Sequence, residues 1–140
     1  MKINTKEEDN SLPFEKEEVW VCEEGWHNAR CKRIDRSRDD ENKVRLVFSL
    51  LDEQSDVYDY VAGKHFENSL KSRTELRKFL FSSFGEGVGR FLNENSRFDI
   101  DKLVGEEVCL CIQQKHSTEH AKPFCNVIDF APRGSITCDS

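Results

Sequence analysis

The segment 43–50 constrains the fold most, because its residues alternate between two kinds without a break. One set is apolar and consists of Val44, Leu46, Phe48 and Leu50. The other set consists of Lys43, Arg45, Val47 and Ser49. Successive side chains of a strand point to opposite faces, so this period of two predicts a strand with one buried face and one face in water.

Four other segments have strand character. Residues 19–35 predict one long, irregular strand, and Gly25 inside it indicates a bulge or bend. A polar turn at 37–42 separates this strand from the alternating segment. Residues 56–62 are rich in Val and Tyr, and the segments 107–113 and 124–130 complete the set of predicted strands.

A single α-helix is expected after the third strand. Ser72 and Glu75 fit a capping box, and apolar residues follow at helical spacing, namely Leu76, Phe79, Leu80 and Phe84. Gly85 is a stop signal. Residues 85–97 predict a loop, and 98–105 predict a short helical turn with Asp99 as its cap.

The predicted order is three strands, a helix and two strands. This is the order of the all-β, five-stranded oligonucleotide/oligosaccharide-binding (OB) barrel with one capping helix. A small open sheet with one helix has the same order and remains an alternative. We expect the domain at 19–133, preceded by a flexible acidic leader at 1–18 and followed by a short tail at 134–140.

Charge argues against a protein that binds nucleic acid over its whole surface. The 140 residues carry a net charge of −6, but residues 26–45 and residues 64–80 each carry a net charge of +3. An acidic protein can therefore still present a basic face. The N-terminus has no apolar stretch, and no apolar run reaches the ~18 residues of a membrane helix. We expect a soluble, cytoplasmic protein without membrane contact.

Catalytic and metal motifs are weak. The string from His116 to His120 matches H-x-x-E-H, but it lies between two predicted strands and Pro123 follows, so a loop is expected. The six cysteines include no C-x-x-C pair. The glycines at 85–89 follow a helix and lack the Gly-Lys-Ser/Thr of a phosphate-binding loop. We expect no catalysis, no cofactor and no structural metal.

Cations on the first two strands form the best candidate site. If these strands pair, Arg30, Lys32, Lys43 and Arg45 share one outer surface, with Ala29, Cys31, Val44 and Leu46 facing the core. The predicted nucleic-acid groove adds Arg36 and Arg38 from the first loop, Lys115 and Lys122 beside the last loop, Trp26 and Phe124 as stacking aromatics, and Tyr60 as a weaker candidate. The alternative interpretation is the solvated side of an ordinary sheet.

Several stretches resemble small phage and prophage proteins of the single-stranded-DNA-binding type, over about residues 19–133. They are Gly25–Ala29, Lys43–Leu50, Thr74–Leu80, Phe98–Val108 and Asn126–Pro132. The resemblance implies an OB-fold that binds single-stranded DNA without sequence specificity in replication or recombination. The resemblance also implies proteins of those pathways as partners. It does not decide whether the protein forms an oligomer. The chain ends Ile-Thr-Cys-Asp-Ser, whereas classical bacterial single-strand binders end in an acidic tail tipped by Pro-Phe.

Two other functions fit the same barrel. The first is a protein-interaction module whose groove holds no nucleic acid, for example an inhibitor of a host protein. The second is an oligosaccharide binder. Strong salt dependence of oligonucleotide binding would favour the DNA-binding hypothesis over both.

Overall fold

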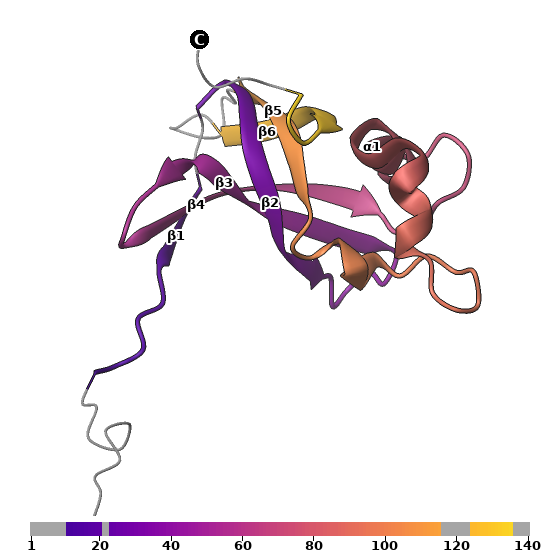
Figure 1. The fold of residues 1–140 in the computed structure, drawn as a ribbon, viewed down its shortest axis with the longest axis horizontal. Coiled ribbons are helices and arrows are strands. Elements are labelled where there is room, and N and C mark those ends of the chain that lie inside the picture. Colours follow the sequence, from indigo (N-terminus) through magenta and orange to yellow (C-terminus); the bar gives the residue numbers. More distant parts are fainter. Residues whose placement is uncertain (1–10, 21–22, 116–123, 136–140) are drawn as a thin grey trace, which may run out of the picture.

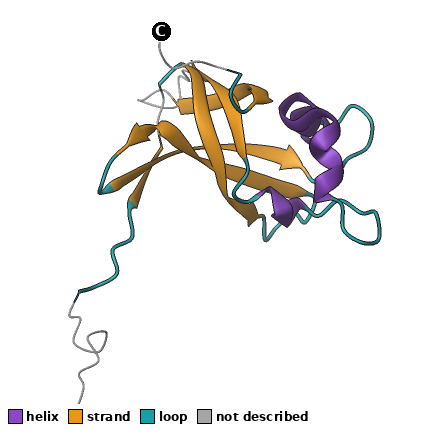
Figure 2. Cartoon of the chain, in the orientation of Figure 1, coloured by secondary structure: helices purple, strands orange, loops and turns teal. Residues whose placement is uncertain are grey.

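The computed structural model describes residues 11–20, 23–115 and 124–135. The chain is mostly β, with one curved six-stranded sheet and an α-helix at one end of it (Figure 1; Figure 2). The strands are β1 (Glu17–Trp20), β2 (Gly25–Arg36), β3 (Lys43–Gln54), β4 (Tyr58–Glu67), β5 (Glu107–Lys115) and β6 (Phe124–Pro132). The all-β class predicted from the sequence is therefore confirmed.

The described strands form an open sheet in the order β1-β4-β3-β2-β5-β6. The prediction of five strands is wrong, because the segment 19–35 is not one strand. The segment divides before Gly25, which has a φ of 117°, a backbone conformation that glycine adopts more readily than other residues. The part before the division is β1, which runs parallel to β4 with Glu17 opposite Tyr58 and Trp20 opposite Val61. This strand begins inside the segment expected to be a flexible leader.

The helix α1 (Glu75–Phe84) begins later than the capping box predicts. Arg73 has a φ of 74°, outside the helical region, so Ser72 cannot be the N-cap. Thr74 takes this role, and its hydroxyl accepts a hydrogen bond from the Arg77 amide at 3.3 Å. Gly85 ends the helix as predicted and donates its N–H to the Phe81 carbonyl.

Two short 3-10 helices connect α1 to β5. The first, η1 (Gly85–Phe91), lies where a loop was predicted. The second, η2 (Ile100–Leu103), confirms the predicted turn, and the Asp99 carboxylate caps it by accepting from the Asp101 amide. No helix in the described ranges is long and apolar enough to cross a bilayer.

The core lies between α1 and one face of the curved sheet. The predicted inward residues of β3, namely Val44, Leu46, Phe48 and Leu50, are at most 3% exposed, and Ala29 and Cys31 of β2 join them. Phe79 of α1 is central, because its ring lies 4.4 Å from that of Phe130 and 5.4 Å from that of Phe66. The helix thus packs β4 and β6 into one core.

We expect Phe79→Ala to lower the free energy of unfolding by about 3–5 kcal/mol, because it leaves a cavity among aromatic rings. Phe81→Ala on the same helix is the matched control. Its side chain is 48% exposed and mainly contacts Arg77, so its loss should cost less than about 1 kcal/mol. Urea unfolding of both variants checks this, and equal losses would contradict the placement of the core.

Candidate nucleic-acid interface

We call the face of β2, β3 and β4 that points away from α1 the outer face. Two rows of residues cross it, each row formed by residues directly opposite one another on the three neighbouring strands. They are Arg33, Val47 and Gly63, and then Asp35, Arg45 and His65. The alternation in the sequence predicts that the outward-facing cations lie on this surface.

A shallow hollow of about 250 Å³ lies at the end of the β2–β3 hairpin, and we call it the hairpin hollow. It is lined by Asp35, Arg36, Ser37, Lys43, Val44, Arg45 and His65. Three of the predicted cations, Arg36, Lys43 and Arg45, therefore meet at one place. His65 was not predicted, and it belongs to the hollow because the β3–β4 register sets it opposite Arg45.

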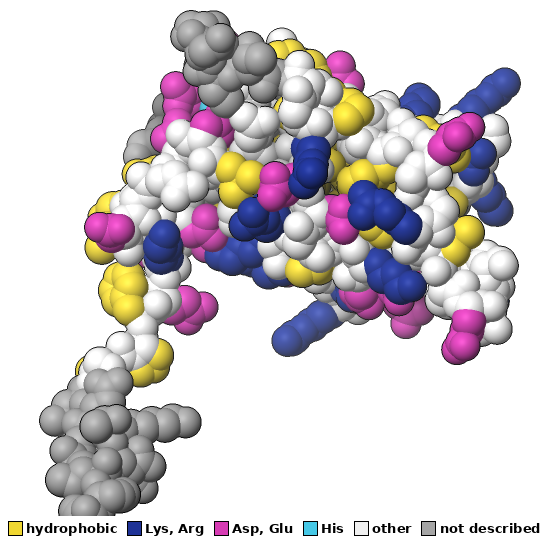
Figure 3. Space-filling model, in the orientation of Figure 1, with side chains coloured by type: hydrophobic (Ala, Val, Ile, Leu, Met, Phe, Trp, Pro, Cys, Tyr) yellow, Lys and Arg dark blue, Asp and Glu magenta, His cyan; other side chains and the backbone are white. Residues whose placement is uncertain are grey.

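Four of the eight predicted cations are paired with carboxylates in the described structure. The pairs are Arg30–Glu107 at 2.8 Å, Lys32–Asp59 at 2.6 Å, Lys32–Glu18 at 2.7 Å, Arg36–Asp101 at 3.1 Å and Arg45–Asp35 at 3.1 Å. Within the described part of the chain, Arg38 and Lys43 have no ion pair. Figure 3 accordingly shows basic and acidic side chains interspersed over the visible face. The sequence predicted the positions of these cations but not their neutralisation.

A bulge in β2 alters the predicted face pattern. The pairing with β3 shifts register between Cys31 and Arg33, so Lys32 is the extra residue of the bulge. As a result both Lys32 and Arg33 pair with Glu18, and Arg33 also pairs with Asp35 at 3.0 Å. Strict alternation had left Arg33 out of the site. No glycine or proline marks the bulge, so the sequence carries no local signal for it.

The short strand β1 contributes two side chains to this surface. Glu18 pairs with Lys32 and Arg33. The Trp20 ring lies against Gly63, and its centroid is 4.9 Å from the guanidinium carbon of Arg45. Val47, in the row of Gly63, is 0% exposed although it lies outside the main core. We infer that β1 covers this part of the outer face.

The remaining aromatic candidates lie elsewhere. Trp26 is 40% exposed at the start of β2, about 30 Å along the strand from the hairpin hollow. Tyr60 is half-buried and packs against the core. Phe124 is opposite Lys115 where β6 begins, and the placement of its side chain is outside the described structure.

The two basic residues beside the last loop do not join the hollow. Lys115 is exposed at the end of β5, the end at which Gly25 of β2 pairs with Ile112. Lys122 lies outside the described residues, as does the string from His116 to His120. The groove as predicted is therefore only partly assembled, and its assembled part is the hairpin hollow.

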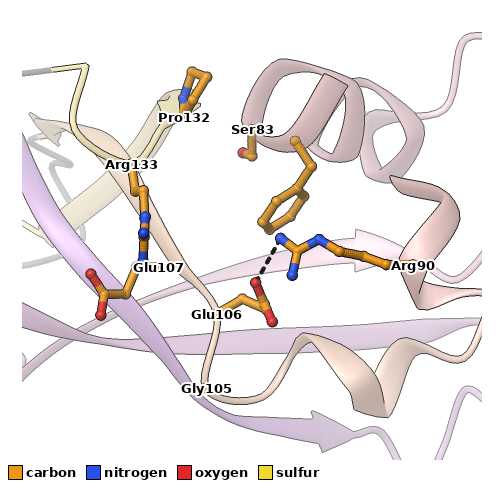
Figure 4. A pocket seen from close by; sticks show the side chains of 8 residues that line it. Ser83, Arg90, Gly105, Glu106, Glu107, Pro132 and Arg133 are labelled. Atoms are coloured by element: carbon orange, nitrogen blue, oxygen red, sulfur yellow. Dashed lines mark ion pairs between the residues drawn. The ribbon is translucent and has the colours of Figure 1, made fainter. Parts of the chain in front are cut away.

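A larger cleft of about 540 Å³ opens between α1, η1, the start of β5 and the end of β6 (Figure 4). Arg90 pairs with Glu106 at 2.9 Å and lies over the rings of Phe84 and Phe91. The buried hydroxyl of Ser83, also in the lining, has no hydrogen-bond partner in the described structure. Because two acids and two arginines line it, this cleft has no net charge to attract a phosphate chain.

Metal and thiol chemistry find little support in the described residues. No group of three or more His, Cys, Asp or Glu side chains there could hold a metal ion. Cys31, Cys109 and Cys111 are free thiols. Burial raises the pKa of Cys31 to about 12, so this thiol stays protonated and is a poor nucleophile at neutral pH.

The sequence matches no protein-family model and no curated protein. The assignment of a function therefore depends on the geometry of the chain itself.

The Glu18 ion pairs predict a specific pH dependence. Hydrogen bonds from Arg33 and Lys32 hold the pKa of Glu18 below its ordinary value of 4.5. A carboxyl whose pKa is lower in the folded state stabilises the fold above its unfolded pKa, and this contribution disappears as the pH falls through the folded pKa. The stability difference between wild type and Glu18→Gln should therefore shrink between about pH 6 and pH 3.

Urea unfolding at a series of pH values measures this difference. Glu17→Gln is the matched control, because it removes the same charge from an exposed neighbour on the same strand. A profile for Glu17→Gln identical to that of Glu18→Gln would contradict the assignment.

Proposed function

We propose that the chain is a cytoplasmic OB-type domain that binds single-stranded DNA without sequence specificity, in replication or recombination. The observation that carries the proposal is the hairpin hollow, where Arg36, Lys43, Arg45 and His65 meet beside one carboxylate. The proposed site lies at the end of the β2–β3 hairpin, where Asp35, Arg45 and His65 of the outer face meet Arg36 and Val44, which pair on the core-facing side.

The strand order supports the OB assignment. Without β1, the sheet reads β4-β3-β2-β5-β6, and α1 lies in sequence between β4 and β5. An OB barrel of partly open type needs its third and fifth strands to approach each other. Here β4 approaches β6, since the Lys64 ammonium donates to the Val127 carbonyl at 3.1 Å and the rings of Phe66 and Phe130 lie 6.0 Å apart.

The position of the hollow supports the ligand class. OB domains bind oligonucleotides on their second and third strands and on the loop between the first two. In this chain that region is β3, β4 and residues 37–42, and the hollow opens where β2, β3 and this loop meet. Arginine and lysine bind phosphate as well as carboxylate, and exposed ion pairs contribute only about 0–1 kcal/mol. A phosphate can therefore replace Asp101 at Arg36 or Asp35 at Arg45.

A protein-interaction module is the second candidate, and one observation favours it. Arg30, Lys32, Arg36 and Arg45 all have carboxylate partners, so the predicted cations offer a ligand little uncompensated charge. An interaction module of this kind would use the sheet without a phosphate track. Measured affinity for an oligonucleotide at low salt decides between the two functions.

We expect the double charge reversal Arg38→Glu with Lys43→Glu to weaken binding of fluorescein-labelled oligo-dT on the order of tenfold or more. The two side chains are exposed and unpaired in the described structure, so folding should be preserved. Each lost phosphate contact should also reduce the slope of log K against log salt by about 0.7. Fluorescence anisotropy at two salt concentrations measures both quantities.

The control is Lys71→Glu with Lys78→Glu, which changes net charge equally before and within α1, at residues that do not line the hollow. An equal loss of affinity in the control would mean that overall charge, not the hollow, determines binding. No measurable binding by the wild type at low salt would overturn the DNA-binding function and leave the interaction module.

A further inference from the structure

We propose that β1 occupies part of the DNA-binding surface itself, as a displaceable strand that imitates a bound oligonucleotide. The site beneath it would take the phosphates and bases of single-stranded DNA through Lys32, Arg33 and Arg45. This inference rests on the proposed function, because it extends the hairpin hollow along the same outer face.

The first argument is the position of the Glu18 carboxylate. It contacts Arg33 and Lys32 at the same time, the latter at 2.7 Å. A phosphate oxygen of a nucleic acid makes the same kind of charge-assisted contact with arginine and lysine that a carboxylate oxygen makes. Glu18 therefore fills a position at which a phosphate would be bound.

The second argument is the position of the Trp20 ring. The ring lies across Gly63 and over the guanidinium of Arg45. A Cβ atom at residue 63 would lie only 3.2 Å from the ring, so the absence of a side chain there leaves room for the ring at this distance. Bases stack on arginine and on flat surfaces in the same way, so Trp20 corresponds to a base in this arrangement.

The third argument is charge. Without β1, this part of the outer face has three cations, Lys32, Arg33 and Arg45, and two acids, Asp35 and Asp59. Glu18 cancels the one remaining positive charge. This part of the surface therefore has no net charge with β1 in place, and it has a net positive charge that attracts an anion when β1 leaves.

The fourth argument is that β1 is weakly attached. It has four residues, lies at the edge of the sheet and, among the described strands, pairs with β4 alone. Before it, Leu12 is 86% exposed and Phe14 70% exposed, so the preceding segment has little apolar contact with the body of the domain (Figure 1). Short edge segments with few buried contacts open at low free-energy cost.

The test compares oligo-dT binding by the wild type, Glu18→Gln and Glu17→Gln at one low salt concentration. Displacement reduces the apparent affinity in proportion to the population of the open state. Glu18→Gln should therefore bind about fivefold or more tightly than the wild type. Glu17→Gln makes the same change of net charge on the opposite face of the strand and should differ from the wild type by less than about twofold.

Hydrogen exchange gives a second measurement on the full chain. Saturating oligo-dT should speed the exchange of the backbone amides at 17–20, because these residues leave β4 when the ligand binds. Slower exchange there would mean that the ligand binds on top of β1, and the inference would be overturned.

The outcomes separate the two proposals. Binding by the wild type with no gain for Glu18→Gln, or with an equal gain for Glu17→Gln, overturns the displacement of β1 and leaves the DNA-binding function standing. Absence of measurable binding by the wild type at low salt overturns both. A gain restricted to Glu18→Gln, with faster exchange at 17–20, supports both.

Discussion

The packing of Phe79 into the concave side of the sheet is the interaction on which the shape of the domain depends. Its ring contacts Phe130 of β6, Phe66 of β4 and Phe48 of β3. Of these three strands, β3 and β4 pair directly, whereas β6 is separated from β3 by β2 and β5. The helix therefore keeps the sheet curved through side-chain packing where no backbone ladder joins β4 to β6 in the described structure. That curvature directs the opposite face of β2, β3 and β4 outward as a continuous surface.

The sequence predicted the features that depend on local pattern. The alternation in 43–50 predicted which side chains of β3 face the core, Gly85 predicted the end of α1, and Asp99 predicted the cap of η2. Each of these depends on residues close together in the chain. The additional strand and the bulge were missed because the pairing of β1 with β4 joins residues about 40 positions apart, and the extra residue at Lys32 has no distinctive composition.

The candidate site illustrates the same limit in electrostatic terms. Residues 26–45 have an excess of cations, and from the sequence alone they were predicted to form a basic surface. In the fold, the partners of Lys32, Arg30 and Arg36 come from β1, β4, β5 and η2, all distant in sequence. A local sum of charges cannot include partners that only the tertiary structure provides. It located the cations of the hairpin hollow but overestimated their free charge.

A surface whose cations are already paired also changes how salt dependence must be interpreted. A basic groove that binds a phosphate releases the counterions of the nucleic acid, and the slope of log K against log salt counts the phosphates. If Glu18 must first leave Arg33 and Lys32, salt weakens this internal pairing as well as the binding of the phosphate. The two effects oppose each other, so the slope of the wild type understates the number of phosphates in contact. Glu18→Gln lacks the internal pairing, and its slope should approach the true number even where its affinity at high salt is little changed.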